Sequence, residues 1–253
     1  MSLPSVTFET KCYEKDWEIL LKTGRLEAMI ARNHYDFAER ILYINNVDDP
    51  DKVRKYAERL MDRGVITEHV LVEDFADEAL NFFGLDRDSF EGGYYYSIQE
   101  LVGIYRCRTD YLLHFSGDSI LDGTFTWLEK AVDRLRNDQR IKVVNCIWNR
   151  KESEAEQEST AQDDDFWVGS GFSDQCYLVK ASDFRARIYG EAHPASQRYP
   201  VYGGELFEKR VDAWMRTNGY LRCTYKHGSY LSRNFPRNRL LRTAGRLMGF
   251  YDR

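Results

Sequence analysis

Apolar and polar residues follow two different periods along the first half of the chain. Short apolar runs with strand character lie at four places, 6–8, 40–46, 69–74 and 110–115. Each run precedes a segment in which apolar residues recur at helical spacing, and these segments begin near residues 16, 51, 97 and 125. Strands that alternate with helices predict a parallel sheet with right-handed crossover connections.

The second half of the chain has a less regular pattern. A polar, acidic stretch at 150–165 follows the apolar run 141–148, and it predicts a surface loop. A strand is predicted at 175–179, a helix at about 205–218 and a last strand at 222–225. The whole pattern therefore predicts an α/β protein.

Length and composition narrow the class of protein. At 253 residues the chain can bury a core without disulfides, and its five scattered cysteines predict neither a disulfide framework nor a zinc cluster. A net charge of −5 argues against nucleic acid as the main partner, because phosphate binding relies on clustered cations. No apolar run approaches the roughly 18 residues that cross a bilayer, and residues 1–5 lack a signal-peptide pattern, so we expect a cytoplasmic protein.

Acidic side chains follow three of the predicted strands. Asp48 and Asp49 come after the second strand, Glu73 and Asp74 end the third, and Asp118 follows the fourth. In open parallel sheets, ligands bind outside the carboxyl ends of the strands, because loops and helix N-termini converge there. The sequence therefore predicts a ligand site at this edge.

Asp118 is the strongest candidate among these acids. Gly117 would let a ligand approach the backbone, and Ser119 adds a hydroxyl beside the carboxylate. A carboxylate here could hold a divalent ion, or it could be an ordinary turn or helix-capping aspartate. The segment alone leaves both interpretations open.

The segment 111–118, reached in the order strand, helix, acidic strand end and helix, resembles glycosyltransferases of the GT-A fold, especially those related to glycosyltransferase family 2. In that family an aspartate-x-aspartate motif ends the corresponding strand, and Ser116-Gly117-Asp118 is a reduced version that keeps the last aspartate. The resemblance implies a three-layer sandwich with a mostly parallel central sheet. It implies one catalytic domain over 1–232, with a nucleotide-binding half at about 1–122 and an acceptor-binding half at about 123–232.

The resemblance also assigns an acceptor side. Gly203-Gly204-Glu205-Leu206 is similar to the family's glycine-rich acidic motif, which implies that Gly203 and Gly204 line the acceptor site and that Glu205 is the general base. A base is needed because the acceptor hydroxyl loses its proton as it attacks. The alternative is a glutamate that the helix dipole favours at a helix start.

A late histidine completes the metal site in many GT-A enzymes. His227 matches it in order along the chain, so the resemblance implies Mn²⁺ or Mg²⁺ held by Asp118 and His227. Lys226 could meet a phosphate directly, together with Gly117 and Ser119. The alternative for His227 is a surface or capping role.

The family's donor site implies further contacts. Thr10 and Lys11 would line the nucleotide base, and Asp48 or Asp49 would meet the base or ribose, although the two aspartates could equally be solvated turn residues. Trp167 begins a segment similar to the acceptor-side glycine-rich loop, where its ring could stack on a sugar.

The C-terminal segment 233–253 is basic and amphipathic, with six arginines and one aspartate. Such a helix suits an anionic membrane surface, which predicts peripheral attachment at the inner membrane. It could equally pack on the domain with its arginines solvated or paired to the acidic body.

These features together predict an enzyme that moves a sugar from a UDP- or GDP-sugar to a glycan or lipid-linked acceptor. A non-catalytic relative that binds the nucleotide sugar or assists assembly is the alternative, supported by Ser116 and Leu206 in place of two family aspartates. A nucleotidyltransferase is a third possibility, but the sequence lacks an early glycine-rich basic loop for a triphosphate.

Overall fold

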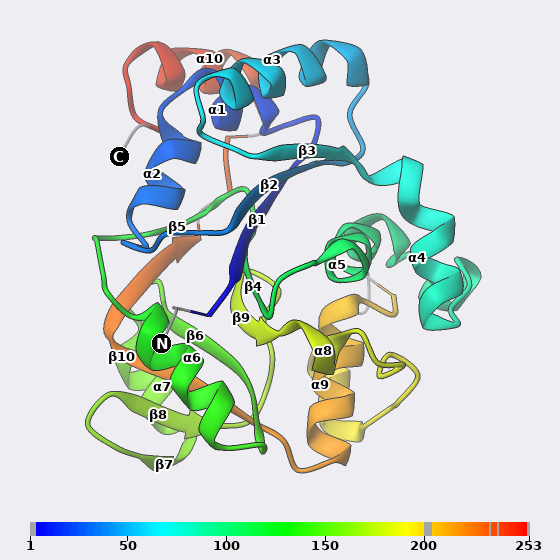
Figure 1. Cartoon of the computed structure of the whole chain (residues 1–253), viewed down its shortest axis with the longest axis vertical. Coiled ribbons are helices and arrows are strands. Elements are labelled where there is room, and N and C mark those ends of the chain that lie inside the picture. Colours follow the sequence, from blue (N-terminus) through cyan, green and yellow to red (C-terminus); the bar gives the residue numbers. More distant parts are fainter. Residues whose placement is uncertain (1–3, 200–203, 233, 237, 252–253) are drawn as a thin grey trace.

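The computed structural model describes residues 4–199, 204–232, 234–236 and 238–251 (Figure 1). In chain order, the first half forms β1 (Val6–Cys12), α1 (Trp17–Lys22), α2 (Arg25–Ala31), β2 (Glu39–Ile44), α3 (Pro50–Asp62), β3 (Glu68–Leu71), η1 (Val72–Phe75), α4 (Ala76–Phe83), η2 (Asp88–Phe90), α5 (Tyr94–Arg106), β4 (Tyr111–Phe115) and β5 (Ser119–Leu121). The second half forms α6 (Leu128–Asn137), β6 (Ile141–Trp148), α7 (Glu152–Gln157), β7 (Ser159–Gln162), β8 (Phe166–Gly169), β9 (Cys176–Lys180), α8 (Ala181–Phe184), η3 (Pro194–Arg198), α9 (Phe207–Thr217), β10 (Leu221–Ser232) and α10 (Arg239–Leu247).

One continuous sheet carries both halves, and within the described residues its strand order is β3-β2-β1-β4-β9-β6-β10-β8-β7, with β5 paired to β10. The first four strands of this order are parallel, as the alternation of strands and helices predicts. The later pairings are mixed, because β9 is antiparallel to both β4 and β6 whereas β10 is parallel to β6. The predicted α/β class with a largely parallel central sheet is confirmed.

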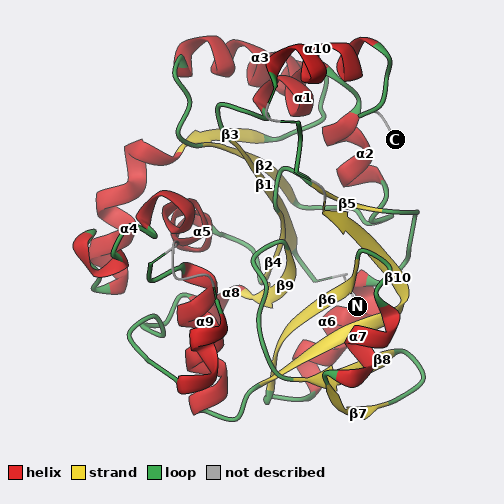
Figure 2. Ribbon diagram, turned by 180° about the vertical axis from the view of Figure 1, so that it is seen from behind, coloured by secondary structure: helices red, strands yellow, loops and turns green. Residues whose placement is uncertain are grey.

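Helices cover both faces of the sheet (Figure 2). One apolar cluster joins the sheet to α1, α2, α3 and α6, and a second joins it to α4, α5, α8 and α9. The period-2 alternation of β2 explains this, since Leu42 and Ile44 enter the first cluster while Ile41 and Tyr43 enter the second. The result is the three-layer arrangement that the resemblance implied.

The acidic stretch 150–165 differs from the prediction. It is not a single surface loop, because it contains the helix α7 and the edge strand β7, which pairs antiparallel with β8. Its side chains are nevertheless mostly exposed. An edge strand of polar residues lacks the apolar alternation that identifies a strand in a sequence.

A fully buried polar pair lies between the sheet and α5. Glu9 of β1 and His114 of β4 are both 0% exposed, and the Glu9 Oε1 to His114 Nδ1 distance is 3.0 Å. Burial raises the pKa of the Glu9 carboxyl well above its usual range and lowers the pKa of the His114 imidazole well below its own. Gly103 of α5 gives this pair its room, because a Cβ there would lie 2.9 Å from the Glu9 carboxyl carbon.

We expect Gly103→Ala to lower the free energy of unfolding by about 1–3 kcal/mol, as overpacking a rigid interior does. An alanine in a helix interior would otherwise stabilise by about 0.5–1 kcal/mol relative to glycine. Urea unfolding measures the difference, and Gly190→Ala is the matched control because nothing lies within 4 Å of a Cβ at that position. A Gly103→Ala protein as stable as wild type would show that Glu9 is not held in place.

The C-terminal segment lies against the first half of the chain. Figures 1 and 2 both place α10 beside α1 and α3, and Arg246 Nη1 lies 3.3 Å from Glu18 Oε2 of α1. None of the described helices is long and apolar enough to span a membrane.

Candidate functional site

The turn after β4 is built to present Asp118. The Ser116 hydroxyl lies 2.9 Å from Asp118 Oδ1 and 2.7 Å from the Ser119 hydroxyl. Gly117 is required by close packing, because a Cβ there would lie 2.6 Å from the Lys11 carbonyl oxygen and 3.0 Å from Asp16 Oδ2. The predicted use of Gly117 for close approach therefore has a structural basis, although the neighbour that approaches is this chain's own backbone.

Arg25, at the start of α2, fixes the backbone of the same turn. Its Nη2 donates to the Asp118 carbonyl oxygen at 2.8 Å and its Nε to the Gly117 carbonyl oxygen at 3.4 Å. Burial lowers the pKa of the guanidinium to about 10, and the negative charge of Asp118 opposes that fall. Arg25 therefore remains a cation at neutral pH and holds the turn through its backbone carbonyl oxygens.

A second acid lies beside this turn. Asp16 is buried and accepts a hydrogen bond of 2.7 Å from the Tyr13 backbone N–H. Burial raises the pKa of the Asp16 carboxyl well above its usual range, and the charge of Asp118 raises it further. Burial, followed by the charges of Asp16 and Asp118, raises the pKa of the Tyr13 hydroxyl to about 12. The charge of Asp118 therefore disfavours the ionised forms of both Asp16 and Tyr13.

Lys11 is the cation at the centre of this region. Its ammonium group forms an ion pair with Glu100 of α5, whose side chain is 0% exposed. Burial would lower the pKa of Lys11, but Glu100 and then Asp174 outweigh it and the pKa is raised. The Lys11 ammonium group is thus paired with a carboxylate, and its contact with a nucleotide base stays a prediction.

Asp174 connects the Asp118 turn to the start of α9. Burial raises the pKa of its carboxyl, Lys11 lowers it, and Asp118 raises it again. Glu208, in the first turn of α9, has a pKa well above its usual range because of burial and then the charge of Asp174, whose backbone N–H donates to the Glu208 carboxylate. Asp174 is therefore the acid that links the other two, because its pKa is raised by Asp118 and its charge raises the pKa of Glu208, while Lys11 is the cation that opposes the rise at Asp174.

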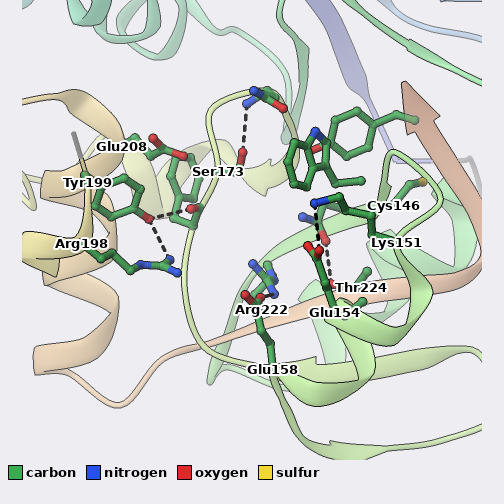
Figure 3. A pocket seen from close by; sticks show the side chains of 16 residues that line it. Cys146, Lys151, Glu154, Glu158, Ser173, Arg198, Tyr199, Glu208, Arg222 and Thr224 are labelled. Atoms are coloured by element: carbon green, nitrogen blue, oxygen red, sulfur yellow. Dashed lines mark hydrogen bonds and ion pairs between the residues drawn. The ribbon is translucent and has the colours of Figure 1, made fainter. Parts of the chain in front are cut away.

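Glu208 faces a cavity of about 400 Å³. Figure 3 shows Glu208, Tyr199 and Arg198 together on one side of it. Across the cavity, Arg222 lies 3.0 Å from Glu158, and Lys151 lies 2.8 Å from Glu154.

The lining of this cavity combines aromatic rings with charged groups. The Tyr199 hydroxyl donates to the Phe172 carbonyl oxygen at 2.7 Å and accepts from Arg198 at 3.0 Å, which fixes the ring in place. Trp148, 41% exposed, adds a second aromatic face with Lys151 Nζ 4.2 Å from its ring centroid. Aromatic faces and charged groups around a space of this size suit a polar ring with hydroxyl groups.

Glu205 does not lie in this cavity. Its carboxylate is 2.5 Å from Lys209 Nζ, and it lines a separate space of about 200 Å³ together with His193 and Arg210. Its neighbour Gly204 has a φ of +61°, and Gly203 lies outside the described residues. The general base at Glu205 stays a prediction, and the glutamate that lines the cavity of about 400 Å³ is Glu208, three residues later.

His227 and Lys226 lie on an irregular part of β10 and contact the segment between β7 and β8. His227 Nε2 is 3.1 Å from the Asp164 carbonyl oxygen and 3.6 Å from Asp165 Oδ1. Lys226 Nζ donates to Gln162 and to the Asp163 carbonyl oxygen, each at 2.6 Å. The contacts of these two residues give no support to a place beside Asp118, and within the described ranges no three His, Cys, Asp or Glu side chains form a ready-made metal site.

Trp167 is a buried residue of β8. Its side chain is 5% exposed and its backbone pairs with Thr224 of β10, so the ring is not available to stack on a sugar. The acceptor contact at Trp167 stays a prediction, and the burial of the ring does not support it. Trp148, at the end of β6, is the tryptophan that lines the large cavity.

The predicted donor residues of the first two strands have mostly structural roles. Thr10 is fully buried in β1, and Asp49 is the N-cap of α3, accepting from the Lys52 backbone N–H at 3.0 Å. The Asp48 backbone N–H donates to Glu14 at 2.9 Å. A separate cavity of about 210 Å³ does lie at the carboxyl ends of β2 and β3, and Asn46 and Tyr94 are among the residues that line it.

Comparison with known proteins gives a match in structure but not in sequence. No protein-family model and no curated protein sequence matches this chain. Among solved structures, GalNAc-T7 with UDP, GalNAc and Mn²⁺ is similar over 91% of this chain, with 10% identity and a TM-score of 0.55. This chain spans 44% of the length of that GalNAc-T7 chain.

Two further structures cover 92% of this chain. A mycobacterial protein has 12% identity, a TM-score of 0.51 and 69% of its own length covered. Glucosyl-3-phosphoglycerate synthase from Mycobacterium tuberculosis, in complex with Mg²⁺ and uridine-diphosphate, has 14% identity, a TM-score of 0.50 and 73% of its length covered. At these identities the similarity establishes the fold, and the chain has the GT-A fold of the glycosyltransferases that it resembles.

Proposed function

We propose that this protein transfers a sugar from a UDP- or GDP-sugar to a hydroxyl group of a glycan or lipid-linked acceptor, with Mn²⁺ or Mg²⁺ at Asp118. The observation that carries the proposal is the cavity of about 400 Å³ that Glu208 lines, together with the charge coupling of Glu208 to Asp174 and of Asp174 to Asp118 of the β4 turn. The solved structures with this fold include complexes with UDP and Mn²⁺ or Mg²⁺.

The residues at the turn suit a divalent cation. Asp118 and Asp174 offer carboxylate oxygens, and the pKa of Asp174 is raised by burial and by Asp118, so a cation near both would favour the ionised form of Asp174. A bound ion would supply positive charge to the leaving diphosphate. Lys11 is the cation that this chain itself places near Asp174.

Glu208 is the proposed general base. Its carboxyl group lines the cavity, and its raised pKa makes the carboxylate a stronger base than that of an exposed glutamate. The Asp174 backbone N–H orients it, and Tyr199 and Arg198 stand beside it (Figure 3). The acceptor hydroxyl would give its proton to the Glu208 carboxylate as it attacks the sugar.

A non-catalytic nucleotide-sugar-binding relative is the second candidate. It is favoured by Ser116, which occupies the position of the first aspartate in the family's motif. The Ser116 hydroxyl donates a hydrogen bond to Asp118, the aspartate of the motif that this chain keeps. A carboxylate that already accepts this bond has less capacity for an ion.

A thermal-shift screen with UDP, GDP and CMP, each with and without Mn²⁺, separates the candidates when it is combined with assays of UDP- and GDP-sugar hydrolysis. We expect UDP or GDP with Mn²⁺ to raise the Tm by about 5–10 °C at about 100 times its Kd. Slow hydrolysis of the matching sugar donor would identify an enzyme, whereas stabilisation without hydrolysis would favour the binding protein. No stabilisation by any nucleotide would contradict both.

A further inference from the structure

The helix α10 exposes its apolar side to solvent. Leu240, Leu241, Leu247, Met248 and Phe250 are between 60% and 80% exposed, and they are the most exposed large apolar side chains of the described chain. The first four recur at a spacing that places them on one side of the helix. Contiguous exposed apolar surface on a monomer marks an interaction site.

The opposite side of the same helix is the one that packs on the domain. Arg246 lies 3.3 Å from Glu18 of α1, and Arg242 Nη1 donates to the Pro236 carbonyl oxygen at 2.9 Å. Gly245 is buried, and a Cβ there would lie 2.8 Å from the Tyr251 hydroxyl. The polar side of the helix therefore faces the domain at Arg246, and the contacts of Arg242 and Gly245 are with residues of the same C-terminal segment.

The charge of the segment indicates which partner covers this apolar side. Residues 233–253 carry six arginines and one aspartate, so the segment has a net charge of +5, whereas the rest of the chain has −10. Each basic residue near an anionic bilayer contributes about 1 kcal/mol to the binding free energy, and this attraction decays within a Debye length of the surface. An apolar stripe on a basic segment has the chemistry of an interfacial helix.

A second copy of the chain fits this surface less well. Stable protein interfaces bury about 1,200–2,000 Å² in total, and a single short helix offers much less. A helix of nine residues such as α10 is about 13 Å long. A bilayer makes no such demand, since one helix can bury its apolar side about 5–10 Å into the headgroup boundary.

We propose that α10 docks the protein on an anionic lipid bilayer through Leu240, Leu241, Leu247, Met248 and Phe250. The proposal goes beyond the transferase function and does not depend on it. It also positions the candidate site, because the Arg25 guanidinium that holds the Asp118 turn lies 5.0 Å from the ring centroid of Phe235, just before α10. Docking would therefore bring the Asp118 side of the molecule toward the membrane surface, where a lipid-linked acceptor would lie.

Vesicle flotation of the full chain tests the proposal. The probes are vesicles of phosphatidylcholine and phosphatidylglycerol in equal parts, and vesicles of phosphatidylcholine alone. The wild type should float with the anionic vesicles, bind the neutral ones about tenfold more weakly, and lose binding as salt is raised. The double variant Leu240→Ser, Leu247→Ser should bind the anionic vesicles at least about tenfold more weakly than wild type.

The matched control is Phe82→Ser, Tyr96→Ser, which removes two exposed aromatic side chains, 38% and 52% exposed, from α4 and α5. Thermal melts confirm that both double variants are folded, and the control should float like wild type. Absence of wild-type binding, equal binding by the leucine variant or an equal loss in the control would each overturn the proposal. Light scattering without lipid tests whether a second copy of the chain occupies this surface instead. A dimer that the leucine variant abolishes would assign the surface to that copy and would also overturn the proposal.

Discussion

Replacing Glu208 with glutamine is expected to lower sugar transfer by about 10²–10⁴-fold, the contribution of a positioned general base. The amide keeps the shape of the side chain and can still accept the hydrogen bond from the Asp174 backbone N–H, but it cannot take a proton. Initial rates with a saturating donor and acceptor measure the loss. Donor binding should change little, because Glu208 is assigned to the acceptor hydroxyl.

The same substitution should leave the fold intact or make it more stable. The pKa of Glu208 is raised in the folded state by burial and by Asp174, so above that pKa the ionised carboxylate lowers the free energy of unfolding. We therefore expect Glu208→Gln to be at least as stable as wild type at pH 8. The difference should shrink as the pH falls through the raised pKa, and wild-type transfer should fall over the same range as the base is protonated.

Glu205→Gln is the matched control, because it makes the same chemical change three residues away. Glu205 is paired with Lys209 and lines a different cavity, so we expect transfer within a few-fold of wild type. If Glu205→Gln abolishes transfer while Glu208→Gln does not, the base belongs to the glycine-rich motif and Glu208 is not the proton acceptor.

The parts of the fold that follow from local pattern were predictable. The four parallel strands of the first half and the position of Asp118 after β4 follow from apolar runs and from the rule that places ligands at the carboxyl ends of strands. The insertion of β9, antiparallel, between β4 and β6 does not, because periodicity identifies a strand but not its partner.

The differences between the predicted and the observed positions of the site residues have the same origin. The predicted helix near 205–218 begins at Phe207, so Glu208 rather than Glu205 occupies its first turn, and only the tertiary structure shows which of the two reaches the cavity. β10 continues to Ser232 with an irregular register between Tyr225 and Ser229, which places His227 beside Asp165. The useful signal for Glu208 was its place inside the helical pattern, where an acid benefits from the helix dipole.

Replacing Asp118 with asparagine is expected to lower sugar transfer by at least about 100-fold, since several kcal/mol of charge stabilisation at the diphosphate would be lost. Stability should be nearly unchanged, because the substitution removes the charge that raises the pKa of Asp16 and Asp174 but also the charge that favours the Arg25 cation. The Arg25 contacts are to backbone carbonyl oxygens of the turn, and the substitution leaves them in place.

Calorimetric titration of the donor nucleotide, in Mn²⁺ and in EDTA, distinguishes loss of the metal ion from disruption of the β4 turn. The wild type should bind more weakly in EDTA, whereas Asp118→Asn should bind equally weakly in both, because the group that couples the nucleotide to the ion is gone. Asp165→Asn is the matched control: this aspartate contacts Lys130 and His227 at the surface, and its loss should leave the dependence on Mn²⁺ intact. If Asp165→Asn abolishes that dependence and Asp118→Asn does not, the ion lies beside His227, and the β4 turn is not the donor site.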